Sequence, residues 1–290
     1  MKQKSSAVIL TKNRPYHWYF ISELSEILDI KFIIIEKNKR SSFFKKLKKH
    51  GFGWTFLKLL SKISNNFSKK IDLEFSKKFK GFDENKIKKK YEEITITTDD
   101  INSNNIKNKL NSTEPKYLCS LGGGIIDNSG ISSSSLALNY HSGISPFYNG
   151  ADSPDKVIES RNLNFFGGTL MVMTEEIDGG PILAHFLPEI DEKDNFESLY
   201  IKNILGGIFL FRDFILFNEK ENTNLRPLQK QKKSLHYYLG YDKTIFTDLV
   251  MNYFFKKKLV KKFIRNEKYL KYYEKKLDFN ELLKILNVIS

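Results

Sequence analysis

The sequence is poor in cysteine, in arginine and in long apolar runs. The single cysteine, Cys119, excludes an internal disulfide framework and any metal site built from several cysteines. No apolar run reaches the roughly 20 residues that a membrane-spanning helix needs. The apolar stretch near the start of the chain is also too short for a signal peptide. We therefore expect a cytoplasmic protein without a transmembrane segment and without a metal cofactor.

Positive charge is abundant but unevenly distributed. The 290 residues include 48 Lys and Arg against 34 Asp and Glu, a net charge of +14, and only 6 of the basic residues are Arg. Residues 37–90 carry 18 basic against 4 acidic residues and residues 226–290 carry 16 against 6, whereas residues 91–225 carry 9 against 20. Lysine is the generic solvated cation, while arginine is favoured for phosphate and base recognition. The two basic blocks are therefore interpreted as solvated or anion-attracting surfaces, with contacts to nucleic acid or membrane left open.

Hydrophobic periodicity predicts an α/β fold. A buried strand over residues 6–13, a helix beginning at Pro15 and a strand over residues 30–36 make one βαβ unit, the start of a parallel sheet. The fold class expected is a Rossmann-like, mostly parallel twisted sheet flanked by helices. The further elements expected are strands near residues 94–97, 116–120, 136–141, 168–174 and 182–188, and a long helix over 194–217 interrupted at Gly206-Gly207.

The chain is expected to consist of two regions with a boundary near residue 220. Residues 1–220 hold the expected catalytic domain, with a basic amphipathic helical insertion at about 37–92. Residues 221–290 are expected to be a basic helical region without strands. Its apolar residues, which include Leu249 and Tyr253, recur at helical spacing and should pack on the catalytic domain or at a homodimer interface. We expect this region not to be needed for the chemistry.

Three groups of residues follow predicted strands, where open parallel sheets bind ligands. Gly122-Gly123-Gly124 would let a ligand approach the backbone closely, although a flexible turn is the plainer interpretation. Asn139 and His141 are two residues apart on a strand and so share one face. Asp178 lies in a glycine turn, where it could orient the imidazole of His141. A structural histidine and simple turn chemistry are the alternatives.

In this order the motifs resemble the folate-dependent formyltransferase family. The pattern is Asn-x-His-x-Gly-x-x-Pro-x-Tyr-x-Gly, then Gly-x-Thr on a strand, then Asp-x-Gly-Pro-Ile, over about residues 116–190. The family includes enzymes that formylate methionyl-tRNA, glycinamide ribonucleotide and nucleotide-linked amino sugars. The combined motif is specific, whereas each piece alone is not.

The resemblance implies a role for each segment. Asn139, His141 and Asp178 match the family's catalytic triad. Residues that match the segment holding the pterin of 10-formyltetrahydrofolate, the formyl donor, are Leu121, Gly122, Gly123, Gly124, Ile125 and Ile126. Residues in the loop that faces the acceptor are Tyr148, Asn149 and Gly150. The strand leading to the catalytic Asp is matched by Gly167 and Thr169.

Departures from the family's sequence pattern reduce the number of acceptor substrates that we expect. Thr11-Lys12-Asn13-Arg14-Pro15 replaces the glycine-rich phosphate loop expected for glycinamide ribonucleotide. The helical pattern after residue 226 differs from the β-barrel with which the methionyl-tRNA enzymes hold tRNA. We therefore expect transfer of a formyl group to the primary amine of a nucleotide-linked amino sugar. Methionyl-tRNA formylation, favoured by the net charge, and a non-catalytic scaffold that binds anionic partners are the alternatives.

Overall fold

A computed structural model describes residues 3–37, 52–53, 56, 67–221, 231, 236–238, 245–275 and 279–287. Its strands are β1 (Ser6–Thr11), β2 (Asp29–Glu36), β3 (Thr95–Thr98), β4 (Tyr117–Leu121), β5 (Leu136–His141), β6 (Tyr148–Gly150), β7 (Gly168–Val172), β8 (Ile182–Leu187), β9 (His236–Tyr238) and β10 (Lys268–Lys271). Its α-helices are α1 (Pro15–Ser25), α3 (Phe67–Lys78), α4 (Glu84–Lys90), α5 (Asn104–Thr113), α6 (Asn128–Ile131), α7 (Ser153–Glu159), α8 (Phe196–Glu221), α9 (Ile245–Lys256) and α10 (Phe279–Ile285). Three short 3-10 helices are η1 (Glu92–Ile94), η2 (Leu163–Phe165) and η3 (Leu259–Phe263).

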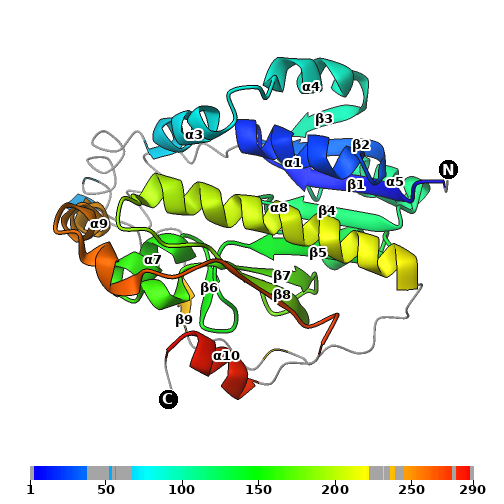
Figure 1. Ribbon diagram of the computed structural model, residues 1–290. Helices are drawn as coiled ribbons and strands as arrows, with labels where there is room; N and C mark the ends of the chain where they lie inside the picture. The colour runs from blue at the N-terminus through cyan, green and yellow to red at the C-terminus, as the bar shows by residue number, and fades with distance from the viewer. Residues whose placement is uncertain are drawn as a thin grey trace.

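One eight-stranded sheet organises the chain (Figure 1). Its strand order is β10-β8-β7-β5-β4-β1-β2-β3. The strands from β3 to β5 in this order pair in parallel. Strands β7, β8 and β10 continue the sheet with antiparallel pairing. The predicted Rossmann-like class, with a mostly parallel sheet flanked by helices, is confirmed.

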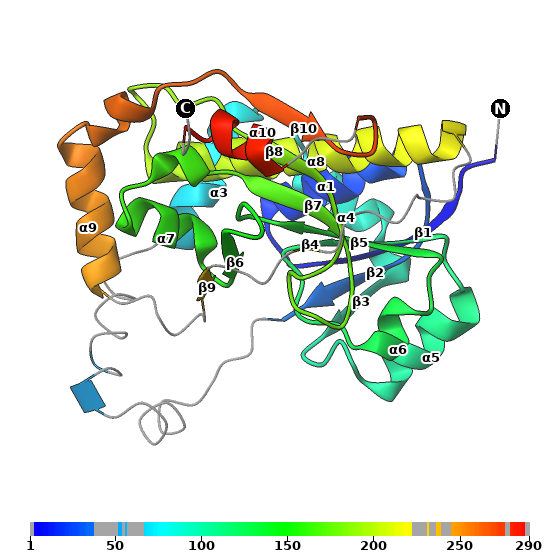
Figure 2. The ribbon, with the colours of Figure 1, turned by 90° about the horizontal axis from the view of Figure 1, so that it is seen from below.

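Helices cover both faces of the sheet (Figure 2). Helices α1, α3 and α8 pack over one face, where their apolar residues join those of the strands in the largest buried cluster. Helices α5 and α6 lie on the other face, where a second buried cluster joins α5 to β1 and β2. Strand β1 pairs with β2 on one side and with β4 on the other, so later strands are added to the sheet on opposite sides of β1. The order of strands therefore reverses beside the carboxyl end of β1. Ligands bind at such a point in open α/β sheets.

Helix α8 runs without a break through Gly206 and Gly207, so the predicted interruption is wrong. A side chain at Gly206 would place its Cβ 2.1 Å from the Phe186 ring, and one at Gly207 would lie 2.4 Å from the Tyr140 ring. The glycine pair therefore lets α8 approach β5 and β8 closely. Such close packing outweighs the low helix propensity of glycine, which costs about 1 kcal/mol relative to alanine.

The region after residue 221 is only partly as predicted. Helices α9 and α10 confirm its helical character, but β9 pairs with β6 and β10 extends the main sheet beside β8. These two strands are three and four residues long, too short for a visible alternation of apolar and polar residues. Leu249 and Tyr253, expected to be buried, are 56% and 51% exposed, while Phe254 of the same helix is 1% exposed.

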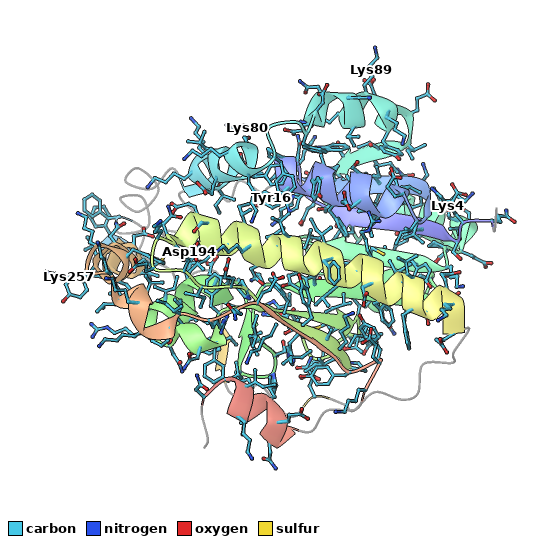
Figure 3. All side chains as sticks on the ribbon, in the orientation of Figure 1. Lys4, Tyr16, Lys80, Lys89, Asp194 and Lys257 are labelled. Atoms are coloured by element: carbon cyan, nitrogen blue, oxygen red, sulfur yellow. The ribbon has the colours of Figure 1, made fainter. Side chains whose placement is uncertain are left out.

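The segment predicted as a basic helical insertion contains helices α3 and α4, whereas its residues 38–51, 54–55 and 57–66 lie outside the described residues. Lys80 and Lys89 in this block and Lys257 in the second basic block point away from the body of the protein (Figure 3). All three are exposed, as the interpretation of solvated basic faces requires. No helix in the described ranges has the length and apolar character needed to cross a membrane.

Candidate active site

The last residues of β5 carry two polar side chains toward one face of the sheet. Asn139 and His141 alternate with Tyr140, which turns to the opposite face and donates a hydrogen bond from its hydroxyl to Asn203 Oδ1 at 2.7 Å. Tyr140 is buried beneath α8, and burial raises its pKa well above the usual value. The strand therefore fixes Asn139 and His141 through packing on its other side.

His141 is held by both of its ring nitrogens. Nε2 lies 2.9 Å from the backbone carbonyl of Tyr148, and Nδ1 lies 3.5 Å from Oδ2 of Asp178. A carbonyl can only accept, so Nε2 carries a hydrogen and donates it to Tyr148. This leaves Nδ1 facing the carboxylate of Asp178. The ring is 8% exposed, so the orientation set by these contacts is retained.

Asp178 is fixed by β6. Its φ of +52° lies in the left-handed region, which a residue other than glycine adopts only at a cost. The backbone N–H of Gly150 donates to Asp178 Oδ2 at 2.9 Å, and Asn149 Nδ2 donates to the Asp178 carbonyl at 3.0 Å. These two bonds compensate for the strain and aim the carboxylate at His141.

Asn139 keeps its amide available. It is half-buried, and its side chain has no hydrogen-bond partner in the part of the chain that the structure describes. An amide offers two N–H donors and a carbonyl acceptor. Asn139 can therefore donate to a ligand oxygen bound at the end of β5. The structure thus brings together all three residues predicted as the catalytic triad.

The three residues predicted to contact the acceptor make up β6 and surround this triad. Tyr148 turns its side chain into the protein, with its hydroxyl 3.0 Å from Ser160 Oγ, and it contributes its backbone carbonyl to His141. Asn149 is 3% exposed, and its Oδ1 has no partner among the described residues. Contact of these residues with an acceptor remains a prediction.

The glycine segment after β4 lies beside the carboxyl end of β1. Thr11 Oγ1 donates to the Leu121 carbonyl at 2.7 Å, which joins the two strand ends. Gly122 has a φ of +69°, and a Cβ there would lie 2.9 Å from Nε2 of the buried His17. Ile125 is 61% exposed, whereas Ile126 is 5% exposed and belongs to the core. The segment therefore presents bare backbone and one apolar side chain at the switch point of the sheet.

Two residues of the motif have structural roles that the sequence did not disclose. A Cβ at Gly143 would lie 2.5 Å from His141 Nε2 and 2.3 Å from the Tyr148 carbonyl oxygen. Thr169 Oγ1 donates to the Gly143 carbonyl at 2.7 Å and accepts from the Ser145 N–H at 3.0 Å. The sequence signal was the fixed spacing of Gly143 and Thr169 from the histidine, but only the coordinates show what each touches.

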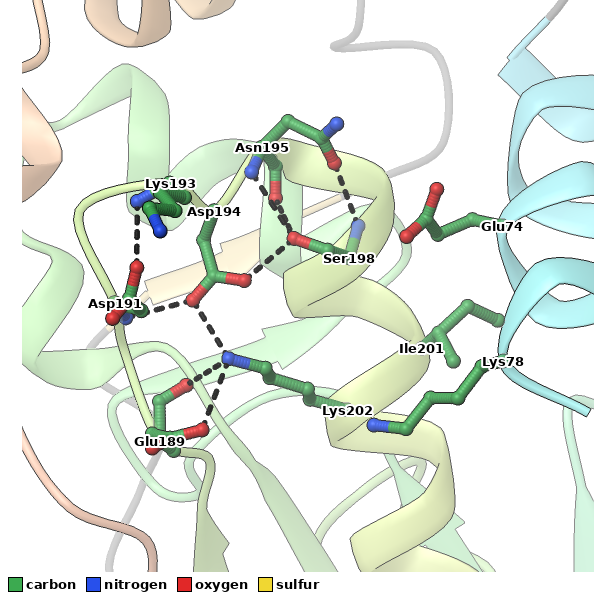
Figure 4. A pocket seen from close by; sticks show the side chains of 10 residues that line it. All are labelled: Glu74, Lys78, Glu189, Asp191, Lys193, Asp194, Asn195, Ser198, Ile201 and Lys202. Carbon is green, nitrogen blue, oxygen red and sulfur yellow. Dashed lines mark hydrogen bonds and ion pairs between the residues drawn. The ribbon is translucent and has the colours of Figure 1, made fainter.

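A cavity of about 530 Å³ lies elsewhere, between α3 and the segment joining β8 to α8 (Figure 4). Lys202 crosses it to pair with Asp194 at 2.8 Å and with Glu189 at 3.3 Å. The cavity is lined by no residue of the triad, and its charges of opposite sign partly neutralise one another. This cavity is therefore separate from the residues predicted to be catalytic. Within the described ranges no three His, Cys, Asp or Glu residues gather as a metal site.

Solved structures with a similar fold include formyltransferases. They include a 4-N formyltransferase from Francisella tularensis (16% identity, TM-score 0.52, 82% of this chain and 77% of that chain). A glycinamide ribonucleotide transformylase from Symbiobacterium toebii is also similar (11%, 0.53, 80% and 96%). So is an N-formyltransferase from Helicobacter canadensis in complex with folinic acid and dTDP-3-aminofucose (15%, 0.51, 84% and 73%). At such identities these likenesses establish the fold.

A family model matches part of the sequence. Residues 73–203 match the family model described as formyl transferase, a range that contains the glycine segment and all three triad residues. No curated protein matches the chain at a significant level. The chain thus carries a formyl transferase domain and is an enzyme that transfers formyl groups, which confirms the resemblance predicted from the sequence.

Proposed function

We propose that this enzyme transfers a formyl group from 10-formyltetrahydrofolate to the primary amine of a nucleotide-linked amino sugar in the cytoplasm. The observation that carries the proposal is the position of His141 between the Tyr148 carbonyl and the Asp178 carboxylate, with the unpartnered Asn139 amide on the same strand face. We further propose residues 1–220 as the catalytic domain, with the insertion at 37–92, and residues 221–290 as its C-terminal region.

The residues beside the triad fit a folate. The backbone of Gly122–Gly124 carries no side chains that would keep a planar pterin away, and Ile125 and Ile177 offer apolar surface, being 61% and 39% exposed. The similar Helicobacter canadensis structure holds folinic acid, a folate derivative. When bound, 10-formyltetrahydrofolate supplies the formyl group, whose bond to the folate nitrogen breaks as a bond to the acceptor nitrogen forms.

The triad supplies the groups that such a transfer needs. Negative charge develops on the formyl oxygen, and the Asn139 amide can donate a hydrogen bond to it. His141 can donate to the same oxygen only by turning an N–H away from the Tyr148 carbonyl. Loss of one donor of this kind costs on the order of 10²–10³ in rate. Asp178 holds the imidazole in place and, directly or through water, helps to remove the proton that the acceptor amine loses.

The amino-sugar acceptor rests on three observations. The Thr11–Pro15 turn lacks the glycine-rich loop expected for glycinamide ribonucleotide. Lysines of the two basic blocks are exposed and can attract the phosphates of a nucleotide. Similar solved structures include a sugar N-formyltransferase from Shewanella and the N-formyltransferase in complex with dTDP-3-aminofucose.

The net charge of +14 favours a second candidate, methionyl-tRNA. One experiment separates the two acceptors: turnover of 10-formyltetrahydrofolate with a panel of nucleotide amino sugars and with charged methionyl-tRNA. Formylation of a nucleotide sugar supports the first proposal. Formylation of the tRNA alone, with an affinity that falls steeply with salt, supports the second. Absence of folate turnover with every acceptor, together with absence of binding of a folate analogue, would contradict both proposals.

A further inference from the structure

A second buried histidine contacts the loop that follows His141. His185 on β8 is 1% exposed, and its Nε2 lies 2.8 Å from the carbonyl oxygen of Ser145. Its Nδ1 lies 2.6 Å from the hydroxyl of Tyr272, which follows β10 directly. The carbonyl can only accept, so Nε2 carries the hydrogen and Nδ1 accepts the hydrogen of Tyr272. The order of donation is therefore Tyr272 to His185 to Ser145.

The hydrogen bonds from Tyr272 to His185 and from His185 to Ser145 can run in only one direction. Burial lowers the pKa of His185 to about 4, so the ring is neutral at neutral pH, and burial raises the pKa of Tyr272, so the phenol keeps its proton. The two rings meet edge to face, with centroids 5.3 Å apart and planes at 87°. The backbone N–H of Tyr272 also donates to the Leu183 carbonyl at 2.9 Å. Tyr272 is thus held on β8 by both its backbone and its side chain.

Ser145, at the end of this series of hydrogen bonds, is linked to the Tyr148 carbonyl that accepts a hydrogen bond from His141. Ser145 is bound at both backbone groups, its carbonyl by His185 and its N–H by Thr169 Oγ1 at 3.0 Å. One residue earlier, the Ile144 carbonyl accepts from the N–H of Tyr148 at 2.9 Å. The Tyr148 carbonyl in turn accepts from His141 Nε2 at 2.9 Å. The position of that carbonyl therefore depends on a loop that His185 holds.

We propose that Tyr272 and His185 are positioning residues for formyl transfer, which fix the His141 imidazole by pinning the 143–148 loop from the C-terminal region. Neither residue needs to contact a reactant. The inference rests on the proposed function where turnover is measured. The inference also predicts how the His141 ring is held when no substrate is bound, so it can be tested separately from turnover.

The first test removes one hydroxyl from the full-length chain. Tyr272→Phe keeps the ring and deletes the donor to His185. Tyr273→Phe is the matched control, because the hydroxyl of Tyr273 donates to Asp213 Oδ2 of α8 at 2.5 Å and is not part of the chain to Ser145. We expect Tyr272→Phe to lower kcat roughly tenfold, with KM within about twofold, since a small misplacement of a catalytic group is costly. Tyr273→Phe should leave kcat unchanged.

The second measurement needs no substrate. The chain has five histidines, so the Cε1–H signals can be assigned in NMR spectra by replacing each histidine in turn. Tyr272→Phe should shift the signals of both His185 and His141, and Tyr273→Phe should shift neither. Unchanged His141 signals together with wild-type kcat in Tyr272→Phe would overturn the inference. Shifted signals in a protein that turns over no acceptor would leave it standing and refute the proposed function.

A third variant pair tests His185 directly. Gln can both donate to Ser145 and accept from Tyr272, whereas Leu can do neither. His185→Gln should therefore retain kcat within a fewfold and a His141 signal close to that of the wild type, while His185→Leu should match or exceed the loss in Tyr272→Phe. Equal kcat in folded Gln and Leu variants would contradict the role of the hydrogen bonds.

Discussion

His141 and His185 show how one side chain acquires two roles in the same sheet. Both rings are buried, and both donate from Nε2 to a backbone carbonyl. His141 donates to that of Tyr148, at the start of β6, and His185 donates to that of Ser145, in the loop before β6. The difference lies at Nδ1, which faces the Asp178 carboxylate in His141 and the Tyr272 hydroxyl in His185. A carboxylate can only accept a hydrogen bond, whereas the phenol of Tyr272, whose pKa is raised by burial, donates one. The partner of Nδ1 is therefore the feature from which we propose a catalytic role for His141 and a positioning role for His185.

The largest effects are expected from the triad. Asn139→Ala, His141→Ala and Asp178→Ala should each lower kcat by at least 10²–10³-fold, because each removes a group that stabilises the same transition state. Circular dichroism and thermal unfolding should show an intact fold. Combined variants should lose far less than the product of the single losses. Near-wild-type turnover in any two of the single variants would refute the assignment of this triad.

Gly143 should be almost as sensitive, although it contributes no side chain. In Gly143→Ala the new Cβ would lie 2.5 Å from His141 Nε2 and 2.3 Å from the Tyr148 carbonyl oxygen, so their hydrogen bond must break or shift. We expect kcat to fall by up to about 10²-fold, the cost of misplacing a catalytic group by about 1 Å. Gly81→Ala is the matched control, since nothing lies within 4 Å of a Cβ there. Equal kcat in the two variants would show that the bond between His141 and Tyr148 is not needed.

The parallel part of the fold could be read from the sequence because its signals are local. β1, α1 and β2 follow one another within residues 6–36, and each apolar run is long enough to show its period. Asn139 and His141 could be paired because strand geometry alone places alternate residues on one face. Asp178 was a possible partner of His141 from its glycine turn, but no local period links positions 37 residues apart, and its place in the triad came from the resemblance.

The contribution of the C-terminal region could not be predicted. β10 is four residues long, and its pairing with β8 joins residues more than 80 positions apart. No pattern within Lys268–Lys271 marks it as a strand of the main sheet. The expectation that residues 226–290 are dispensable for the chemistry stays a prediction, and two residues of this region contact the part of the chain that carries the triad. Tyr272 bonds to His185, and the Arg265 guanidinium bonds to the carbonyls of Asn164, Phe166 and Pro188.

The smallest expected effect concerns stability in acid, where the buried His185 should contribute. Its folded-state pKa of about 4 lies below the 6.5 of an unfolded chain, because burial disfavours the charged ring. The unfolded state therefore binds a proton below pH 6.5 that the folded state does not bind until about pH 4. The free energy of unfolding should fall across this window, by up to about 1.4 kcal/mol per pH unit for one such group. His17, with a pKa lowered to about 3, adds to the slope.

Replacement by a neutral residue isolates this contribution. His185→Gln keeps a donor and an acceptor but cannot gain the proton, so its unfolding free energy should fall less steeply between pH 6.5 and 4 than that of the wild type. His17→Gln should flatten the same window, and the double variant should flatten it further. Urea denaturation at half-unit pH intervals measures the slope. A His185→Gln slope equal to that of the wild type would show that His185 takes up its proton in the folded protein as readily as in the unfolded chain, which the burial of the ring beside Ser145 and Tyr272 argues against.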